Sequence, residues 1–400
     1  MELIDRNRYV DKVLAYMGKG LIIVLTGQRR VGKSCVMQCA ARRIKQRDEN
    51  ANIIYINKEF AEFNAISTYC YLNEYVSERL QAECKNYLLI DEVQDIESFE
   101  NSLRNFQAKG ACDIIVTGSN AKMLSGELAT YLSGRYIELH IQSLDYSEFQ
   151  TFHQLPDCDE TFRKYLSFGG LPQLAHIGLD NSQMIASYLG DIYNTVIMKD
   201  VISRENIRNI RFLTDLVRFV SDNIGKNISA NSISKFMRSQ QIAISPALTS
   251  NYLGFLCNAY IISRAKRFDI HGKKLFETNE KYYFEDIGLR NSLVGVNLRN
   301  DIEKLLENVV YLHLCNNEFQ VTIGQLQNGE IDFVAEKGNK RMYIQVCYLL
   351  ATQETIDREF GNLRKIKDDY PKMVVCMDAM AAGSNYQGIE CVHIRNFLKQ

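Results

Sequence analysis

The stretch LIIVLTGQRRVGKS, residues 21–34, decides the fold of the first third of the chain. An apolar strand at 21–26 runs into the pattern G-x-x-x-x-G-K-[ST], and a helix with apolar residues at helical spacing follows. The glycines let the loop curl so that backbone N–H groups face phosphate oxygens, and the helix N-terminus adds attraction for anions. Lys33 can reach the β- and γ-phosphates, and the Ser34 hydroxyl can ligate Mg²⁺. The stretch therefore predicts binding of ATP with Mg²⁺ by Gly27, Gln28, Arg29, Arg30, Val31, Gly32, Lys33 and Ser34.

A second apolar strand, at 87–90, ends in two carboxylates, Asp91 and Glu92. Because parallel strands carry ligands at their carboxyl ends, Asp91 is placed to hold Mg²⁺. Glu92 is placed to orient or deprotonate the attacking water, which makes it the predicted catalytic carboxylate. The alternative is that both residues are exposed charges at the start of a loop. A further strand at 113–117 leads to residues 118–120, where polar side chains such as that of Asn120 can sense the γ-phosphate or position water. Taken alone, this segment is only a turn.

Short apolar runs alternate with helical stretches through about residue 140. Fully apolar strands separated by helices are typical of a parallel sheet covered on both faces. We therefore expect an α/β P-loop domain at 1–140, with strands at 21–26, 52–56, 87–90 and 113–117.

Length and composition limit what the rest of the chain can be. A chain of 400 residues favours two or three domains, and a formal net charge of −1 gives no global argument for nucleic-acid binding. The N-terminus lacks the apolar core of a signal peptide, and no apolar run approaches membrane-spanning length. Eleven scattered cysteines without C-x-x-C spacing favour free thiols in a reducing compartment. These features predict a cytoplasmic protein without a membrane partner.

The middle of the chain is predicted to hold a helical extension at 141–226 and a winged-helix module at 227–290. In the second region, two helices with the N-cap and proline pair Ser245-Pro246 resemble a helix-turn-helix, and a hairpin follows. A basic patch there suits the phosphate backbone of DNA, although acidic neighbours dilute it. The alternative is a module that packs against or contacts protein. The patch consists of Arg264, Lys266, Arg267, Lys273 and Lys274.

The C-terminal region, 291–400, follows the order helix, three strands, helix, strand, which resembles the core of restriction-endonuclease-like folds. Nucleases of that fold use carboxylates to hold a metal and a lysine near the attacking water. Glu307 and Asp332 stand at two carboxylate positions, but the E-x-K position reads Gln345 and Cys347. We therefore predict a degenerate nuclease-like domain without catalysis, with a metal-dependent nuclease as the alternative.

The motifs taken in order resemble AAA-type (AAA+) P-loop ATPases. More narrowly, they resemble a prokaryotic family that has a C-terminal restriction-endonuclease-like domain of unknown function. The loop G-x-R-R-V-G-K-[ST], the later L-x-G-R at 132–135 and G-G-L-P at 169–172, and FEDIGLR at 284–290 carry the resemblance over nearly the whole chain. The resemblance implies that 117–120 form the sensor-1 region. It also implies that Arg135 is an arginine finger, which a neighbouring subunit of a homo-oligomer often supplies. The alternative for Arg135 is a surface or salt-bridge arginine.

Together these patterns predict an ATP-binding protein with Mg²⁺-dependent hydrolysis coupled to rearrangement of the C-terminal domains. The alternative is a nucleotide-gated module that binds DNA or protein with little turnover. A salt-dependent DNA affinity carried by the basic patch would favour this alternative.

Overall fold

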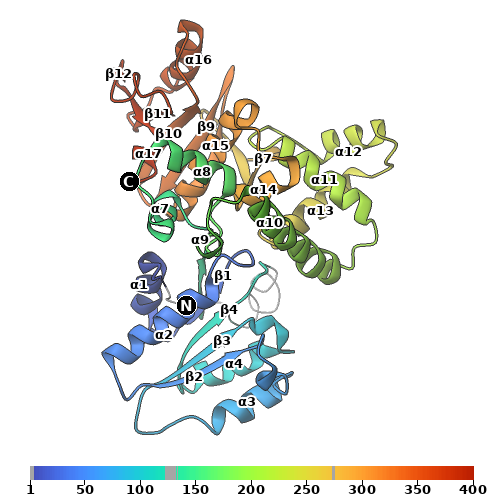
Figure 1. Ribbon diagram of the computed structural model, residues 1–400, viewed down its shortest axis with the longest axis vertical. Helices are drawn as coiled ribbons and strands as arrows, with labels where there is room; N and C mark the ends of the chain where they lie inside the picture. The colour runs from blue at the N-terminus through green and yellow to red at the C-terminus, as the bar shows by residue number, and fades with distance from the viewer. Residues whose placement is uncertain (1–3, 122–131, 133, 273–274) are drawn as a thin grey trace. The chain divides into compact units, whose positions relative to one another are not determined.

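The computed structural model describes residues 4–121, 132, 134–272 and 275–400, and the chain forms two compact units (Figure 1). The N-terminal unit contains the described residues up to Ile141 together with the short segment Asn258–Tyr260. The C-terminal unit contains Gln142–Cys257 and Ile261–Gln400. The chain therefore passes from one unit to the other three times.

The N-terminal unit is built on a sheet whose described strands run in the order β2-β3-β4-β1-β5, all of them parallel. The predicted parallel α/β sheet is confirmed. The fifth strand, β5, was missed because it lies at an edge of the sheet, where Leu139 is its one buried residue, and its sequence has no continuous apolar run. The strands are β1 (Ile22–Thr26), β2 (Asn52–Asn57), β3 (Asn86–Asp91), β4 (Asp113–Thr117) and β5 (Tyr136–His140).

Helices cover both faces of this sheet. Alternate strand residues such as Val24 and Ile90 pack with Leu72 and Leu103 of α3 and α4 in one apolar cluster. The intervening residues, such as Ile23, are equally buried on the other face. The helices are α1 (Asn7–Tyr16), α2 (Lys33–Arg47), α3 (Tyr69–Ser77) and α4 (Phe99–Ala108), with the short turns η1 (Ala61–Phe63) and η2 (Val93–Asp95).

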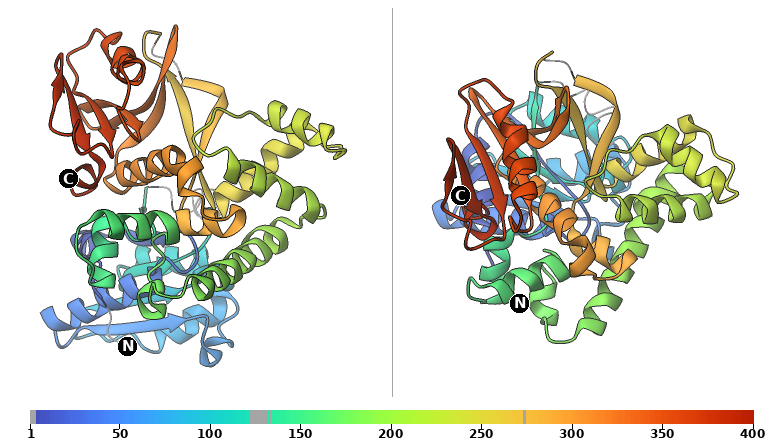
Figure 2. Two further views of the ribbon diagram at one scale, coloured as in Figure 1. Left: turned by 45° about the horizontal axis from the view of Figure 1, so that its top comes forward. Right: turned by 90° about the horizontal axis from the view of Figure 1, so that it is seen from above.

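The C-terminal unit begins with helices and continues into a mixed sheet (Figures 1 and 2). Its described strands run in the order β12-β13-β11-β10-β9-β8-β6-β7. The helices are α7 (Tyr146–His153), α8 (Asp159–Phe168), α9 (Leu174–Ile177), α10 (Ser182–Val196) with the π-helical continuation η3 (Ile197–Ser203), α11 (Ile210–Asp222), α12 (Ala230–Ser239), α13 (Pro246–Asn258), α14 (Ile287–Val294), α15 (Leu298–Asn316), α16 (Gln353–Arg364) and α17 (Ile394–Phe397). The strands are β6 (Ile262–Asp269), β7 (Leu275–Phe284), β8 (Gln320–Leu326), β9 (Gly329–Lys337), β10 (Lys340–Cys347), β11 (Lys372–Cys376), β12 (Asn385–Tyr386) and β13 (Ile389–His393).

The hairpin β6–β7 belongs to this sheet. We expected it to be the wing of a module separate from the nuclease-like region, but Arg267 to Asp269 of β6 pair in parallel with Ile323 to Gln325 of β8. No break between two sheets therefore falls at residue 290. The sequence pattern could not show this pairing, because β6 and β8 meet only after α14 and α15 have intervened.

Two helices cover opposite faces of the C-terminal sheet. Tyr311 of α15 lies with its ring centroid 6.1 Å from that of Phe333 on β9. Phe360 of α16 packs in a cluster with Val334, the next residue of the same strand. Since successive strand residues point to opposite faces, α15 and α16 lie on opposite sides of the sheet.

The motifs G-G-L-P at 169–172 and FEDIGLR at 284–290 meet around one buried carboxylate. Asp286, which is 1% exposed, accepts hydrogen bonds from the backbone N–H groups of Gly170 (2.8 Å) and Leu289 (3.0 Å). A Cβ on Gly288 would lie 1.9 Å from the carbonyl oxygen of Phe168, so only glycine fits there. The G-G-L-P and FEDIGLR motifs therefore fasten one part of the C-terminal unit to another.

Candidate nucleotide-binding site

The loop between β1 and α2 has the backbone that its glycines predict. Gly27 has φ +136°, and a Cβ at this position would lie 2.2 Å from the carbonyl oxygen of Ile141. Gly32 has φ +96° and is the N-cap of α2. Lys33 is 5% exposed, and its ammonium donates to the carbonyl oxygens of Gly27 (2.9 Å) and Gln28 (2.8 Å). The lysine is thus held inside the loop at the start of the helix, where phosphate oxygens are attracted.

An arginine that the sequence analysis did not single out supports the same loop. Arg6, which precedes α1 and is 4% exposed, donates to the carbonyl oxygen of Val31 (3.0 Å) and lies 4.6 Å from the ring centre of Tyr9. It ties the start of α1 to the nucleotide loop. A single arginine ahead of a helix has no distinctive spacing, so the sequence offered no signal for it.

The two predicted Mg²⁺ ligands lie together, Ser34 in the first turn of α2 and Asp91 at the end of β3. The Ser34 hydroxyl donates to the carboxylate of Asp91, which is 1% exposed. Burial raises the pKa of Asp91, while the hydrogen bonds from Ser34 and Thr117 oppose that rise. A hydroxyl beside a carboxylate is a set of hard oxygen donors, so these two residues fit Mg²⁺.

Thr117, at the end of β4, organises the two adjacent carboxylates. Its hydroxyl donates to Asp91 (2.5 Å) and accepts from the backbone N–H of Glu92 (2.9 Å). The neighbouring strand therefore fixes both the side chain of Asp91 and the backbone of Glu92.

Glu92 has an unusual backbone conformation and a crowded carboxylate. Its φ is +56°, which costs a non-glycine residue about 1–3 kcal/mol and is common at functional sites. Its Oε2 accepts from the side-chain amide of Gln94 and from the Ser119 hydroxyl (3.4 Å), and lies 4.0 Å from an Nη1 atom of Arg29. The predicted catalytic carboxylate is thus held beside the loop by three side chains.

The two remaining predicted site residues lie in different places. Asn120 is 4% exposed and follows β4, at the same edge of the sheet as Asp91. Arg135 is exposed and precedes β5, at the opposite edge of this parallel sheet. One strand length, about 13 Å, separates it from the edge that holds the loop. Arg135 is therefore not gathered with the other site residues of its own chain.

Comparison with known proteins agrees with this geometry. A family described as an AAA domain matches residues 19–150, and a domain of unknown function (DUF8612) matches residues 159–300. An uncharacterized protein of Haemophilus influenzae is 30% identical over 409 aligned positions, which cover 100% of this chain and 99% of that protein. The chain belongs to this family of AAA-domain proteins. An uncharacterized protein of Methanocaldococcus jannaschii is 28% identical over 366 positions, covering 87% of this chain and 79% of the relative.

The fold of the AAA-domain protein is also similar to a solved structure. A Walker-type ATPase of Pyrococcus abyssi superposes with a TM-score of 0.50 at 14% identity, covering 72% of this chain and 95% of that one. This likeness is one of fold. Among the described residues, no helix is both long and apolar enough to cross a membrane.

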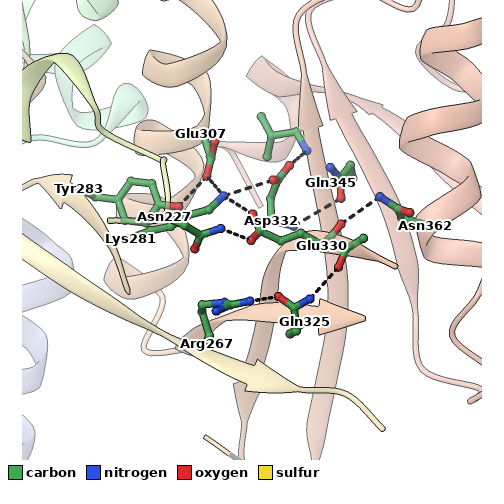
Figure 3. Close-up of polar contacts among 12 residues, drawn as sticks. Asn227, Arg267, Lys281, Tyr283, Glu307, Gln325, Glu330, Asp332, Gln345 and Asn362 are labelled. Atoms are coloured by element: carbon green, nitrogen blue, oxygen red, sulfur yellow. Dashed lines mark hydrogen bonds and ion pairs between the residues drawn. The ribbon is translucent and has the colours of Figure 1, made fainter. Parts of the chain in front are cut away.

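The predicted nuclease-like residues of the C-terminal unit form a second polar centre, the Lys281 cluster, which consists of Lys281, Glu307, Glu330 and Asp332 (Figure 3). The ammonium of Lys281 lies 2.9 Å from Glu307, 2.8 Å from Glu330 and 3.7 Å from Asp332. Burial alone would lower the pKa of Lys281, but the surrounding carboxylates outweigh it and raise the pKa. Burial and the charge of Glu307 raise the pKa of Asp332 well above its usual range.

The predicted E-x-K position does not supply the lysine of this cluster. The Gln345 side chain accepts a hydrogen bond from the backbone N–H of Asp332 (3.4 Å). Cys347 is buried, and its thiol forms a hydrogen bond with Cys376. The lysine comes from β7, which the sequence analysis placed in a different module. In the part of the chain that the structure describes, no group of three His, Cys, Asp or Glu residues is arranged to hold a metal ion.

The basic patch predicted in the hairpin is partly engaged within the unit. Arg264 lies 3.6 Å from Glu280, and the guanidinium of Arg267 donates to Gln325. Lys273 and Lys274 lie outside the described residues. Arg264 and Arg267 therefore have protein partners that compete with a phosphate backbone.

Proposed function

We propose that this AAA-domain protein binds ATP with Mg²⁺ and hydrolyses it to ADP and phosphate. The observation that carries the proposal is the meeting of Lys33, the Ser34–Asp91 pair and Glu92 at the carboxyl-end edge of the sheet, where β4 lies between β1 and β3. A cation donor, two metal ligands and a catalytic carboxylate at one sheet edge are the parts that phosphoryl transfer needs.

Each side chain has a distinct role in this reaction. The Lys33 ammonium pairs with oxygens of the β- and γ-phosphates, and backbone N–H groups of residues 27–34 bind the others. Ser34 and Asp91 hold Mg²⁺, which when bound offsets the negative charge of the phosphates. A water oxygen attacks the γ-phosphorus, the bond to the bridging β–γ oxygen breaks, and Glu92 accepts a proton from that water. Asn120 contacts the γ-phosphate or the attacking water.

The coupling part of the proposal is that the nucleotide state changes the arrangement of the C-terminal unit. It is supported by the three passages of the chain between the units, two of which flank Asn258–Tyr260. Solution scattering with ADP and with a non-hydrolysable ATP analogue tests this part. Identical scattering in the two states would remove it.

Arg135 is proposed to act on a neighbouring subunit, because its own nucleotide loop lies at the other edge of the sheet. Mixing inactive Glu92→Gln protein with Arg135→Ala protein tests this role. Recovery of turnover in the mixture is expected if the arginine works between chains.

Phosphate release by wild type and Glu92→Gln tests the reaction. We expect the substitution to retain ATP binding and to lower turnover about 10²- to 10⁴-fold, the usual contribution of a general base. Glu97→Gln is the matched control, since Glu97 is an exposed acid five residues further along and should turn over normally. Equal turnover in Glu92→Gln and wild type would show that Glu92 is not the catalytic carboxylate.

A further inference from the structure

A three-residue segment from far along the sequence lies in the N-terminal unit beside the nucleotide site. Asn258–Tyr260 follows the matched AAA domain by more than a hundred residues, yet it is part of that unit. The carbonyl oxygen of Asn258 accepts a 2.9 Å hydrogen bond from the backbone N–H of Ala121. Ala121 directly follows Asn120, so one end of the segment is bonded to the residue next to the predicted γ-phosphate sensor.

Tyr260 anchors the other end of the segment. It is 8% exposed, its ring centroid lies 4.7 Å from that of His140, and its hydroxyl donates to Oε1 of Glu138 (3.4 Å). Its φ is +53°, in the left-handed region that a bulky side chain rarely adopts. Such a conformation persists only where the surroundings fix it, so the contacts of the ring and hydroxyl hold the backbone there.

The contacts of Tyr260 lead directly to the nucleotide loop. Oε1 of Glu138 also accepts a 2.6 Å hydrogen bond from the Thr26 hydroxyl, so Tyr260 and Thr26 share one acceptor atom. Thr26 is the last residue of β1 and precedes Gly27, the first residue of the loop. One carboxylate therefore links the start of the loop to Tyr260.

We propose that Asn258–Tyr260 is a positioning segment for the nucleotide site and that Tyr260 is its positioning residue. Through Glu138 it sets the start of the phosphate loop, and through Ala121 it sets the position of Asn120. In return, the segment carries the nucleotide state to α13 and β6. This inference rests on the proposed ATPase function and names the route of its coupling.

The flanking elements explain why a shift of the segment is passed on. Helix α13 ends at Asn258 and strand β6 begins at Ile262. Few residues between them can absorb a change in backbone angles, and one of them, Tyr260, is held by its ring. Since helices and strands move as rigid pieces, a displaced segment moves the end of one and the start of the other.

The test uses the full chain with Tyr260→Gly and Tyr260→Phe. Glycine removes the ring and accepts a left-handed backbone freely, whereas phenylalanine removes only the hydroxyl. We expect Tyr260→Gly to raise the KM for ATP about tenfold, the scale of one lost hydrogen bond and its packed ring, and to change kcat less. Tyr260→Phe should raise the KM about twofold. Gln154→Gly is the matched control, because Gln154 is also left-handed (φ +53°) but caps α7 in the C-terminal unit.

Hydrogen exchange of α13 and β6 distinguishes a positioning role of Tyr260 from a merely structural one, which would leave the effect of the nucleotide on exchange unchanged. In wild type, peptides covering α13 and β6 should exchange at different rates with ADP and with a non-hydrolysable ATP analogue. In Tyr260→Gly this difference should fall about fivefold or more, while Gln154→Gly keeps it. If Tyr260→Gly does not fold, Glu138→Gln tests the same link, since Glu138 is exposed and its carboxylate joins Tyr260 to Thr26. That variant should raise the KM about threefold.

The outcomes separate this inference from the function on which it rests. If wild type binds and hydrolyses ATP but the variants keep its KM and its exchange difference, the positioning role is wrong and the ATPase function stands. The same holds if wild type shows no nucleotide-dependent exchange in α13 and β6. If wild type neither binds nor hydrolyses ATP, both proposals are overturned.

Discussion

The nucleotide site and the Lys281 cluster each surround a buried lysine with oxygen atoms, but they are assembled in different ways. The nucleotide loop is one continuous run in which Lys33 donates to carbonyls five and six residues away. The Lys281 cluster takes its members from β7, α15 and β9. A contiguous motif carries its geometry in its own backbone, whereas a dispersed cluster exists only once the sheet has formed.

The two lysines also differ in what their partners can do. Lys33 is bonded to loop carbonyl oxygens, which a phosphate with its greater charge can replace as acceptors. Lys281 faces three carboxylates whose combined charge exceeds its own. We therefore expect Lys33 to serve ligand binding and Lys281 to serve the stability of the C-terminal unit, and the following predictions test that division.

The largest effect is expected for Lys281→Met. Removing one partner from a buried ionic group leaves its carboxylates uncompensated, which costs about 3–5 kcal/mol in the free energy of unfolding. Native-state hydrogen exchange of α15 and β9 measures this cost. Lys85→Met is the matched control, because Lys85 pairs with Asp113 at 2.8 Å but is half-exposed, so about 0–1 kcal/mol is expected. A loss below about 1 kcal/mol for Lys281→Met would mean that the cluster does not stabilise the unit.

A smaller effect is expected for Lys33→Ala, and it concerns ATP affinity rather than stability. Losing a charge-assisted contact to phosphate costs about 1.5–3 kcal/mol of binding free energy, which is about 10- to 100-fold in ATP affinity. Isothermal titration with ATP and Mg²⁺ measures it, and Lys45→Ala near the end of α2 serves as the control for an exposed lysine. The free energy of unfolding without nucleotide should change by less than about 1 kcal/mol. Unchanged affinity, or a large loss of stability, would break the contrast between the two lysines.

The smallest effect is the dependence of stability on pH through His153. Burial lowers the pKa of His153 to about 4 from its ordinary value of 6.5, and its buried Nε2 has no hydrogen-bond partner among the residues that the structure describes. The unfolded chain therefore takes up the proton first, and stability is lost as the pH falls from about 6.5 towards about 4. Lys281, whose pKa is raised, stays charged throughout this range and contributes no such loss.

Urea unfolding at pH 7 and pH 5 measures this loss in wild type and His153→Leu. Allowing for the partial exposure of the ring, we expect wild type to lose about 1 kcal/mol more than the variant between the two values. Equal losses in the two proteins would show that His153 is not a source of acid sensitivity.

Some features of this protein were fixed by local sequence. The apolar runs at 21–26, 52–56, 87–90 and 113–117 each form a strand of the parallel sheet, because a strand buried on both faces needs no partner to be recognised by its composition. The nucleotide loop followed from the positions of Gly27, Gly32, Lys33 and Ser34, because the backbone angles those glycines permit are a local property.

The tertiary structure decided what depends on contacts between distant residues. Hydrogen bonding between backbones placed β6 beside β8, and neither strand's composition specifies its neighbour. Lys281 joins Glu307 and Asp332, and Tyr260 joins Glu138, only because the chain folds back over long separations. The sequence alone thus determined a P-loop α/β domain and the loop residues that we propose bind phosphate. Which side chains support that site, and which lysine stands among the C-terminal carboxylates, were decided by long-range packing, since such contacts have no fixed spacing along the chain.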